Sequence, residues 1–428
     1  MRKIIHSCCR IVLICAIALV SSVCNADNLN LRHLTEAQRQ VIAKGAAWGS
    51  IISLADGSLG VIVQRGRPLS EFNAVNVAME WMRSIDGGKS WSDPVILGER
   101  LGPDGQLFER TDDNGYIVFQ ERNQALGQLP SGRIIVAYSR INHYYGPDGE
   151  SRKAPDSLFN HKNLGVFYTW SDDFGATWES AHTLPSGMFG GKHGAVTPHG
   201  RIITLKDGTA LMSLYGSLNP EYSNSSSVPP GTKAIAGVIR SRDNGQSWGD
   251  ISLILHKEDP FSYEETSLCI IDQDKLLAHI RTPSGNVDQY ISDDGGRIWR
   301  LVGAVTEKDQ HPAGAFRLVS GKILLTWGNR RPPFGAAAML SSDEGQTWDY
   351  TNAVSLAWDA PGRNCGYANG TQAADGSIFV VYYVMPNVVN YRELWKQSTI
   401  YIVHFTEEQL LQVSQQVKSS IAKRTKNQ

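Results

Sequence analysis

Short apolar segments recur along the chain, and a turn precedes each of them. A Gly or an Asp marks each turn, and a run of Val, Ile, Leu and aromatic residues follows, as in RIIVAYSR and KILLTWGNR. Runs of this length and composition between turn residues predict β-strands. The six turns stand at Gly57, Gly132, Gly208, Asp274, Gly321 and Gly376.

A second motif, Ser-x-Asp-x-Gly-x-x-Trp, alternates with these strands and is called the Asp box below. Asp can accept hydrogen bonds from its own turn, Gly accepts positive φ, and Trp buries a large ring, so the motif predicts a stapled hairpin turn. The five copies begin at Ser84, Ser171, Ser241, Ser292 and Ser341. Repeats with a period of roughly 40–50 residues or more indicate stacked blades. Six strand units alternating with five boxes therefore predict an all-β fold, a six-bladed β-propeller.

The chain is expected to divide into a leader, a lead-in, a propeller and a tail. Residues 1–26 read as a secretion signal, because Arg2 and Lys3 precede an apolar run that is too short to span a bilayer, and Ala26 supplies a small residue after it. Residues 27–46 form a lead-in, within which 35–43 predicts a short helix. Residues 47–406 form the propeller and 407–428 a helical tail. We expect a secreted or periplasmic protein whose mature chain does not span a membrane.

Charge and cysteine content exclude several classes of partner. The 41 basic and 42 acidic residues nearly balance, and removal of the leader leaves a slightly acidic chain, which argues against nucleic acid. Four of the six cysteines lie in the leader. The other two are too few for a disulfide scaffold and do not follow a zinc pattern. The sequence therefore predicts neither a metal nor another cofactor.

The direction of the strands predicts which residues form the candidate site. The inner strand of a blade begins on the face where the second strand ends, so both positions should ring the mouth of the central channel. Counting back from the turns gives Ala47/Trp48, Arg122, His199, Glu265, His311 and Tyr367. Counting forward gives Arg65, Arg140, Gly216, Arg281, Arg330 with Arg331 beside it, and Tyr383. A ring with several arginines and a glutamate predicts a site for an anionic ligand.

Each of these residues also has a purely structural interpretation. Arg281 with Arg330 or Arg331 predicts a clamp for a carboxylate, since guanidinium groups bind carboxylates through two hydrogen bonds. Any one arginine is as compatible with a surface ion pair between blades. Tyr367 is compatible with a buried strand tyrosine, and His199 and His311 with structural histidines. Glu265 favours the functional interpretation, because a carboxylate at an inner-strand start needs a partner or an exposed channel.

Over nearly all of the mature chain the sequence resembles the Asp-box sialidase superfamily. The five boxes carry the resemblance of fold. EETSLCIIDQDKLLAHIR resembles the segment in which a Glu precedes an Arg by sixteen residues, here Glu265 and Arg281. WGNRRPPFG resembles the segment with the next substrate-binding Arg, and CGYANGTQAADG the one with the nucleophilic Tyr367. The resemblance implies retaining hydrolysis of an acidic sugar, with Tyr367 as nucleophile and Glu265 as its base.

The first blade departs from the family's pattern. The family begins its first inner strand with Arg-Ile-Pro, but this chain has Ala47-Trp48-Gly49. The family's acid/base Asp falls where this chain has Asn73, with Glu71 nearby as a substitute. Arg65, Arg67 and Arg122 are the candidates to restore the missing positive charge. Trp48 is expected to stack on the sugar ring.

Three functions remain open. The first is a secreted sialidase-like glycoside hydrolase with a carbohydrate substrate, sialic acid or another acidic sugar. The second is a polysaccharide lyase, in which Tyr367 or a His removes a proton next to a uronic carboxylate. The third is a carbohydrate-binding propeller without catalysis, since a fold does not by itself carry a function.

Overall fold

The strands of the central part of each sheet are apolar because both of their faces are buried. The computed structural model describes residues 32–70, 73–98, 101–102, 104–155, 160–185, 196–217, 234–254 and 264–414. In β5 (Val75–Ser84) and β23 (Ile323–Asn329) almost every residue is buried, whereas the outer strand β21 (Arg300–Ala304) is largely exposed. Continuous apolar runs therefore mark the middle strands, which are packed on both sides.

Hydrogen bonding groups the described strands into five sheets. A ten-stranded sheet contains β3 (Ala46–Ser53), β4 (Leu59–Pro68), β5, β6 (Val95–Ile96), β7 (Phe108–Arg110), β8 (Tyr116–Gln128), β9 (Ile134–Tyr145), β10 (His161–Ser171), β11 (His182–Thr183) and β13 (Gly200–Arg201). The next contains β12 (Val196–Pro198), β14 (Ile203–Thr204), β15 (Ala210–Ser217), β16 (Ala234–Ser241) and β17 (Gly249–Ile254). The third contains β18 (Glu264–Asp272), β19 (Lys275–Arg281), β20 (Val287–Ser292) and β21.

The last two sheets each include a strand from the start of the described chain. One contains β22 (Gln310–Arg317), β23, β24 (Gly335–Ser341), β25 (Val354–Ala357) and β1 (Arg32–His33). The other contains β26 (Cys365–Gln372), β27 (Ser377–Val384), β28 (Thr399–Thr406) and β2 (Gln38–Lys44). The pairing of β2 with β28 joins the beginning of the described chain to its last sheet.

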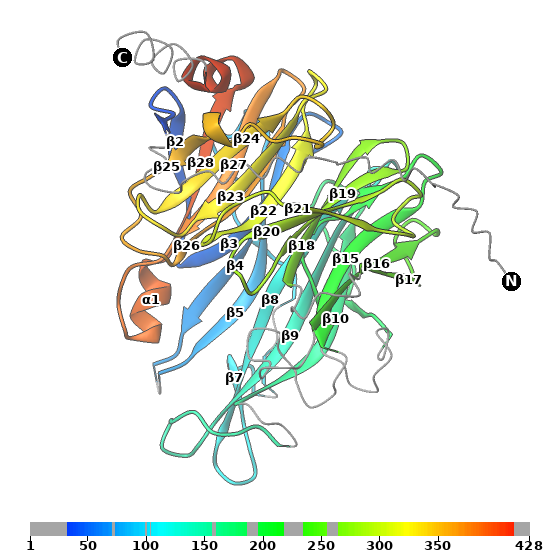
Figure 1. Ribbon diagram of the computed structural model, residues 1–428. Helices are drawn as coiled ribbons and strands as arrows, with labels where there is room; N and C mark the ends of the chain where they lie inside the picture. The colour runs from blue at the N-terminus through cyan, green and yellow to red at the C-terminus, as the bar shows by residue number, and fades with distance from the viewer. Residues whose placement is uncertain are drawn as a thin grey trace, which may run out of the picture. The chain divides into compact units, whose positions relative to one another are not determined.

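The sheets follow one another around a ring, which gives a propeller-like arrangement. The strands β3, β8, β12 with β13, β18, β22 and β26 contact one another in this order, and β26 contacts β3 again. In Figure 1 the labelled strands β3, β18 and β22 of this ring lie in the middle of the molecule. The ten-stranded sheet holds two antiparallel meanders, β3 to β6 and β8 to β11, joined where Val77 pairs with Gln120. The fold is thus mostly β, and the number of blades, six, stays a prediction.

The helix predicted over 35–43 is wrong. Residues 38–44 form β2, whose backbone pairs with β28 across more than 350 residues of sequence. Tertiary pairing overrides the local preference for a helix here. The secretion signal, by contrast, lies outside the described residues.

The Asp boxes form the stapled turns that their sequence predicts. In each box the Ser hydroxyl donates to the Asp carboxylate over 2.7–2.8 Å. The backbone amide of the box Gly donates to the same Ser hydroxyl. The box glycines have φ between 78° and 87°, which glycine adopts without strain.

The boxes lie at the end of the strands opposite to the inner-strand starts, as strand direction predicts. Ser341, which opens the last box, pairs with Ile323, and Ile323 pairs with Arg317 at the end of inner strand β22. The start of that inner strand, Gln310, pairs with Asn329 at the far end of β23. The box tryptophans are therefore remote from the strand ends that carry the candidate site.

Helices are short in the described part of the chain. The helix α1 (Tyr391–Gln397) lies between β27 and β28 and packs on β4 (Figure 1). The Asn390 side chain caps it by accepting a hydrogen bond from the Glu393 amide. A 3-10 turn, η2, spans Tyr350–Asn352, and residues 407–414 are also helical. No helix among these residues is long and apolar enough to cross a membrane.

Candidate active site

Irregularities at the starts of the inner strands shape the site. The strand register shifts between Ala47 and Ser50, Arg122 and Gln124, Glu264 and Ser267, Gln310 and Ala313, and Gly366 and Asn369. Within four of these shifts a residue other than glycine has φ between 41° and 51°, namely Trp48, Asn123, Glu265 and Tyr367. The shared register shift and positive φ show that these four residues occupy corresponding positions in their sheets. Bulges re-aim side chains.

Tyr367 and Glu265 meet across two different sheets. The Tyr367 hydroxyl donates a hydrogen bond to Glu265 Oε1. The other carboxylate oxygen, Oε2, accepts from Arg281 Nη1 over 3.0 Å. The inner-strand positions predict that Glu265 and Tyr367 both lie at the mouth of the channel, and the structure brings the two side chains into contact. The arrangement places a carboxylate on the phenol proton and a guanidinium behind that carboxylate.

Charge and burial set the protonation of this pair. Burial alone raises the pKa of Glu265, but Arg281 and the hydrogen bond from Tyr367 help to hold it below its ordinary value. Burial and the adjacent Glu265 charge raise the pKa of Tyr367 well above that of free tyrosine. At neutral pH the pair therefore consists of a neutral phenol and an ionised carboxylate, which is the state in which the carboxylate can act as a base.

Arg330 rather than Arg331 belongs to the site. The Arg330 guanidinium carbon lies 5.3 Å from the centroid of the Tyr367 ring, and Nη2 donates to the Tyr383 hydroxyl over 3.2 Å. Arg331 instead forms an ion pair with Glu307 at 2.6 Å and donates to the Tyr350 hydroxyl. Arg281 and Arg330 are thus the two predicted clamp arginines that the structure places around Tyr367.

The two predicted histidines are buried beside the site. The His199 ring centroid is 5.9 Å from that of Tyr367. Burial lowers the pKa of His199, and burial together with Arg281 and Arg330 lowers the pKa of His311 to about 3. Both rings are therefore neutral at physiological pH. Because neither carries a charge there, they can pack near the cationic clamp without repelling it.

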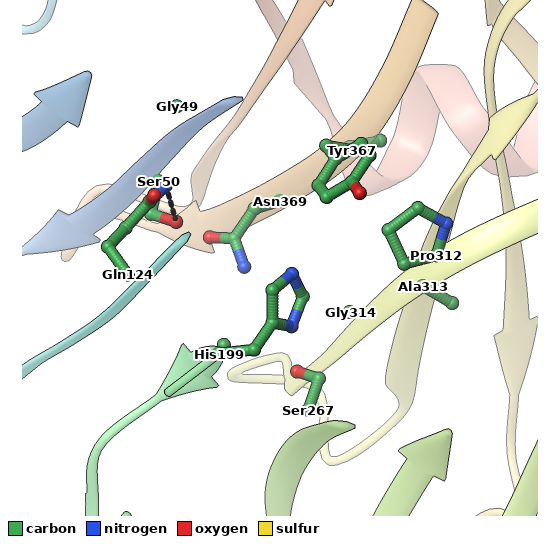
Figure 2. A pocket seen from close by; sticks show the side chains of 12 residues that line it. Gly49, Ser50, Gln124, His199, Ser267, Pro312, Ala313, Gly314, Tyr367 and Asn369 are labelled. Atoms are coloured by element: carbon green, nitrogen blue, oxygen red, sulfur yellow. Dashed lines mark hydrogen bonds between the residues drawn. The ribbon is translucent and has the colours of Figure 1, made fainter. Parts of the chain in front are cut away.

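Tyr367 lines a cavity of about 20 Å³ together with His199, Ser267 and Asn369 (Figure 2). A single water molecule needs about 10–15 Å³ by this kind of measure, so no sugar ring can enter here. A sugar bound at Tyr367 must therefore occupy space outside this cavity.

Trp48 occupies the position at which the first inner strand lacks an arginine. Its ring centroid is 6.3 Å from that of Tyr367, 5.3 Å from that of Tyr383 and 5.5 Å from that of Trp395 in α1. Aromatic rings at these separations pack favourably against one another. The site therefore has an aromatic wall where the resemblance implies a third cation.

The candidates for restoring that charge differ in their partners. Arg65 forms an ion pair with Glu80 and donates to the Lys44 carbonyl, and Arg67 is 3.5 Å from the same Glu80. Glu80 therefore offsets the charge of both. Arg122 donates to the Gln120 side chain and to the Tyr391 hydroxyl, and its guanidinium carbon lies 5.7 Å from the Trp48 ring. Glu71 lies outside the described residues.

Several residues of the site escaped the sequence analysis. The residue that corresponds to Tyr367 in β8 is Asn123, not Arg122, and its amide donates to the Tyr215 hydroxyl over 2.6 Å. Glu264 lies 3.5 Å from Arg281, and burial and Glu265 raise its pKa. Asn123 precedes Gly132 by the same number of residues as Tyr367 precedes Gly376, so an equal count in all the inner strands would have identified it.

Three comparisons place the chain among known proteins. Residues 120–381 match the family model described as a BNR repeat-like domain. A sialidase of Paraclostridium sordellii is 24% identical over 317 residues, which cover 68% of this chain and 69% of that protein.

Solved structures agree in fold. A protein of unknown function from Dyadobacter fermentans is 20% identical, with a TM-score of 0.64 over 86% of this chain and 97% of its own. The NanB sialidase of Streptococcus pneumoniae is 14% identical, with a TM-score of 0.61 over 89% of this chain and 71% of its own. At these identities the likeness supports the fold alone.

Proposed function

This chain belongs to the family of BNR repeat-like domains, and we propose that it is a retaining exo-glycoside hydrolase of the sialidase type. Its substrate in this proposal is a glycan that ends in sialic acid or another acidic sugar. The observation that carries the proposal is the chain of contacts from Tyr367 to Glu265 to Arg281, with Arg330 over the tyrosine ring.

In the first step Tyr367 Oη attacks the anomeric carbon while the glycosidic bond breaks. The phenol proton passes to Glu265 Oε1, which already accepts it as a hydrogen bond. Free tyrosine has a pKa of about 10, so it needs such a base to act as a nucleophile at neutral pH. The leaving oxygen takes up a proton from an acid or from water.

In the second step water attacks the same carbon and releases the tyrosine. The proton held by Glu265 returns to Tyr367 Oη, and a proton of the attacking water is lost to solvent. Two displacements at one carbon retain the anomeric configuration. Throughout, Arg281 and Arg330 hold the carboxylate of the sugar, for which two guanidinium groups are suited.

A tyrosine suits an acidic substrate better than a carboxylate nucleophile does. A neutral phenol does not repel the sugar's carboxylate, whereas an aspartate or glutamate in its place would. The weak point of the site is proton delivery to the leaving group, because Asn73 stands where the family has its acid. We therefore infer that the enzyme favours leaving groups that need little protonation.

The finer features of the architecture and location belong to the same proposal. We infer six blades from the two meanders of the ten-stranded sheet and the four remaining sheets. We also infer export, because the leader sequence and a glycan substrate both fit an extracellular or periplasmic protein.

The test is release of reducing sugar from a panel of acidic glycans by the purified protein and its Tyr367→Phe variant. The account predicts that the variant folds but loses kcat by orders of magnitude, since phenylalanine offers no nucleophile. Equal turnover by both proteins would remove Tyr367 from the mechanism. Binding without turnover by the unmodified protein would favour the carbohydrate-binding alternative, to which the missing first-blade arginine points.

A further inference from the structure

Arg122 is a half-buried cation whose hydrogen-bond partners are neutral. Its guanidinium donates to Gln120 Oε1 over 2.6 and 2.9 Å and to the Tyr391 hydroxyl over 2.8 Å. Neighbouring arginines behave differently: Arg65 pairs with Glu80, and Arg140 pairs with Glu121 at 2.9 Å. Among the described side chains, then, Arg122 lies beside the site with its positive charge offset by no carboxylate.

Arg122 lines a cavity of about 390 Å³ that adjoins the site. This volume falls in the range of sites for small molecules. The other walls offer amide, hydroxyl and imidazole groups and the Tyr391 ring, and they include Asn73, His143 and Asn160. Glu150 is the one acidic residue among the described lining residues, and it is exposed. Such a lining suits the hydroxyl groups of a sugar and leaves Arg122 for an anionic substituent.

Trp48 connects this cavity to Tyr367. Its ring contacts Tyr367 on one hand and lies 5.7 Å from the Arg122 guanidinium carbon on the other. The contacts of Arg122 are with Gln120, Tyr391 and Trp48. Arg281 and Tyr367 instead bind Glu265, and Arg330 lies over the Tyr367 ring. A carboxylate held by Arg281 and Arg330 therefore belongs to a different position from an anion held by Arg122.

We propose that this cavity binds the sugar next to the one that Tyr367 attacks, and that Arg122 selects an oxyanion on that second sugar. This inference rests on the proposed function and narrows its substrate class to glycans with two acidic sugars in succession. The oxyanion is a carboxylate or a sulfate ester, because a guanidinium fork binds both through paired hydrogen bonds. Trp48 would then lie beside the glycosidic bond that joins the two sugars, because its ring is near both Tyr367 and Arg122.

The kinetic test compares substrates that differ only at the second sugar. These are a dihexuronic acid, the same compound with its second carboxylate methyl-esterified, and a hexuronyl hexose sulfate. A charge-assisted hydrogen bond contributes about 10- to 100-fold in affinity, so KM should rise by that factor on esterification. In Arg122→Gln the preference for the anionic form should disappear, and in Arg122→Lys part of it should remain. The control is Arg110→Gln, which removes an exposed cation elsewhere on the same sheet and should keep the preference.

A binding test separates this inference from the proposed function. The three compounds are titrated by calorimetry into Tyr367→Phe and into Tyr367→Phe/Arg122→Gln. Loss of the preference for the anionic forms in the double variant supports the cavity's role even if the protein hydrolyses none of the compounds. Equal affinity for acid and ester in Tyr367→Phe, or a preference that survives loss of Arg122, overturns it. The affinity of the hexuronyl hexose sulfate, compared with that of the dihexuronic acid, shows whether Arg122 binds a sulfate ester or a carboxylate more tightly.

Discussion

At one end of the sheets five Asp boxes repeat the same hydrogen bonds, while at the other end the corresponding positions hold different residues, Trp48, Asn123, Glu265 and Tyr367. The box bonds join residues at most four positions apart, as from Ser247 to Asp243. The bonds of the other end join distant residues, as from Tyr367 to Glu265. Local and repeated contacts build the scaffold, whereas the chemistry depends on what differs between equivalent positions. Substitutions at the two ends should therefore have separable effects, on stability at the first and on catalysis at the second.

The largest effect is expected from Glu265→Gln. The single carbonyl oxygen of glutamine replaces only one of the two oxygens that accept from Tyr367 and Arg281, and glutamine cannot take the phenol proton. Loss of a general base costs about 10²- to 10⁴-fold in rate, so kcat should fall by that factor on the best substrate of the panel. Circular dichroism checks that the variant remains folded. A kcat within a few-fold of the unmodified enzyme would mean that Glu265 is a structural partner of Arg281.

The next largest effect depends on the leaving group. It tests the consequence of having Asn73 in the first blade where the family has an acid. An aryl sialoside needs little protonation on cleavage, whereas sialyllactose needs a proton that Asn73 cannot supply. The aryl sialoside should therefore be cleaved weakly, and sialyllactose at least tenfold more slowly in kcat/KM. Comparable rates would show that another group, such as Glu71, delivers the proton.

A smaller effect is expected from loss of one Asp box. Asp294 accepts hydrogen bonds from Ser292 Oγ and from the amides of Arg297 and Ile298. Each such bond contributes about 1 kcal/mol, and since this turn lies near solvent, Asp294→Ala should lower the free energy of unfolding by about 1–2 kcal/mol. Turnover should stay unchanged. The matched control in the same box is Asp293→Ala, at an exposed position. A loss of turnover in folded Asp294→Ala would show that substitutions in the boxes also affect catalysis at the other end of the sheets.

The smallest effect is a difference in pH dependence. Hydrogen bonds from Thr177 lower the pKa of Asp173 to about 2, so its stabilising contribution is present above about pH 4 and is lost as the pH falls toward 2. Burial and Glu265 raise the pKa of Glu264, so its contribution is present below about pH 4.3 and is lost as the pH rises. Urea unfolding of Asp173→Asn should thus depend less on pH at the acid end, and that of Glu264→Gln less above pH 4.3. The opposite pattern would contradict these assignments.

The scaffold could be predicted from the sequence because its contacts are local. The box Ser, Asp and Gly contact one another within one turn, so their spacing in the sequence is enough to predict that turn. Tyr367 and Glu265 were also predictable, because each stands at a fixed distance before an inner turn. The box turns and the positions of Tyr367 and Glu265 along their strands are both independent of how the sheets pack.

The remainder depends on contacts that no spacing reveals. Residues 38–44 form a strand rather than a helix because β28 offers them an edge. Arg65 looked available for substrate, but the buried Glu80 on the next strand binds it. Tyr391 and Trp395 reach the site from α1, which no repeat of the chain predicts.

The central claim is that Tyr367 becomes covalently attached to the sugar, and a trapping experiment tests it most directly. The enzyme is incubated with a fluorinated acidic sugar that carries a good leaving group, so that the glycosyl-enzyme forms faster than water can remove it. The protein is then digested, and its peptides are analysed by mass spectrometry. The account predicts one added sugar on the peptide containing Tyr367, and none in Tyr367→Phe. An adduct on another residue, or hydrolysis of the natural substrate with no adduct on Tyr367, would contradict it.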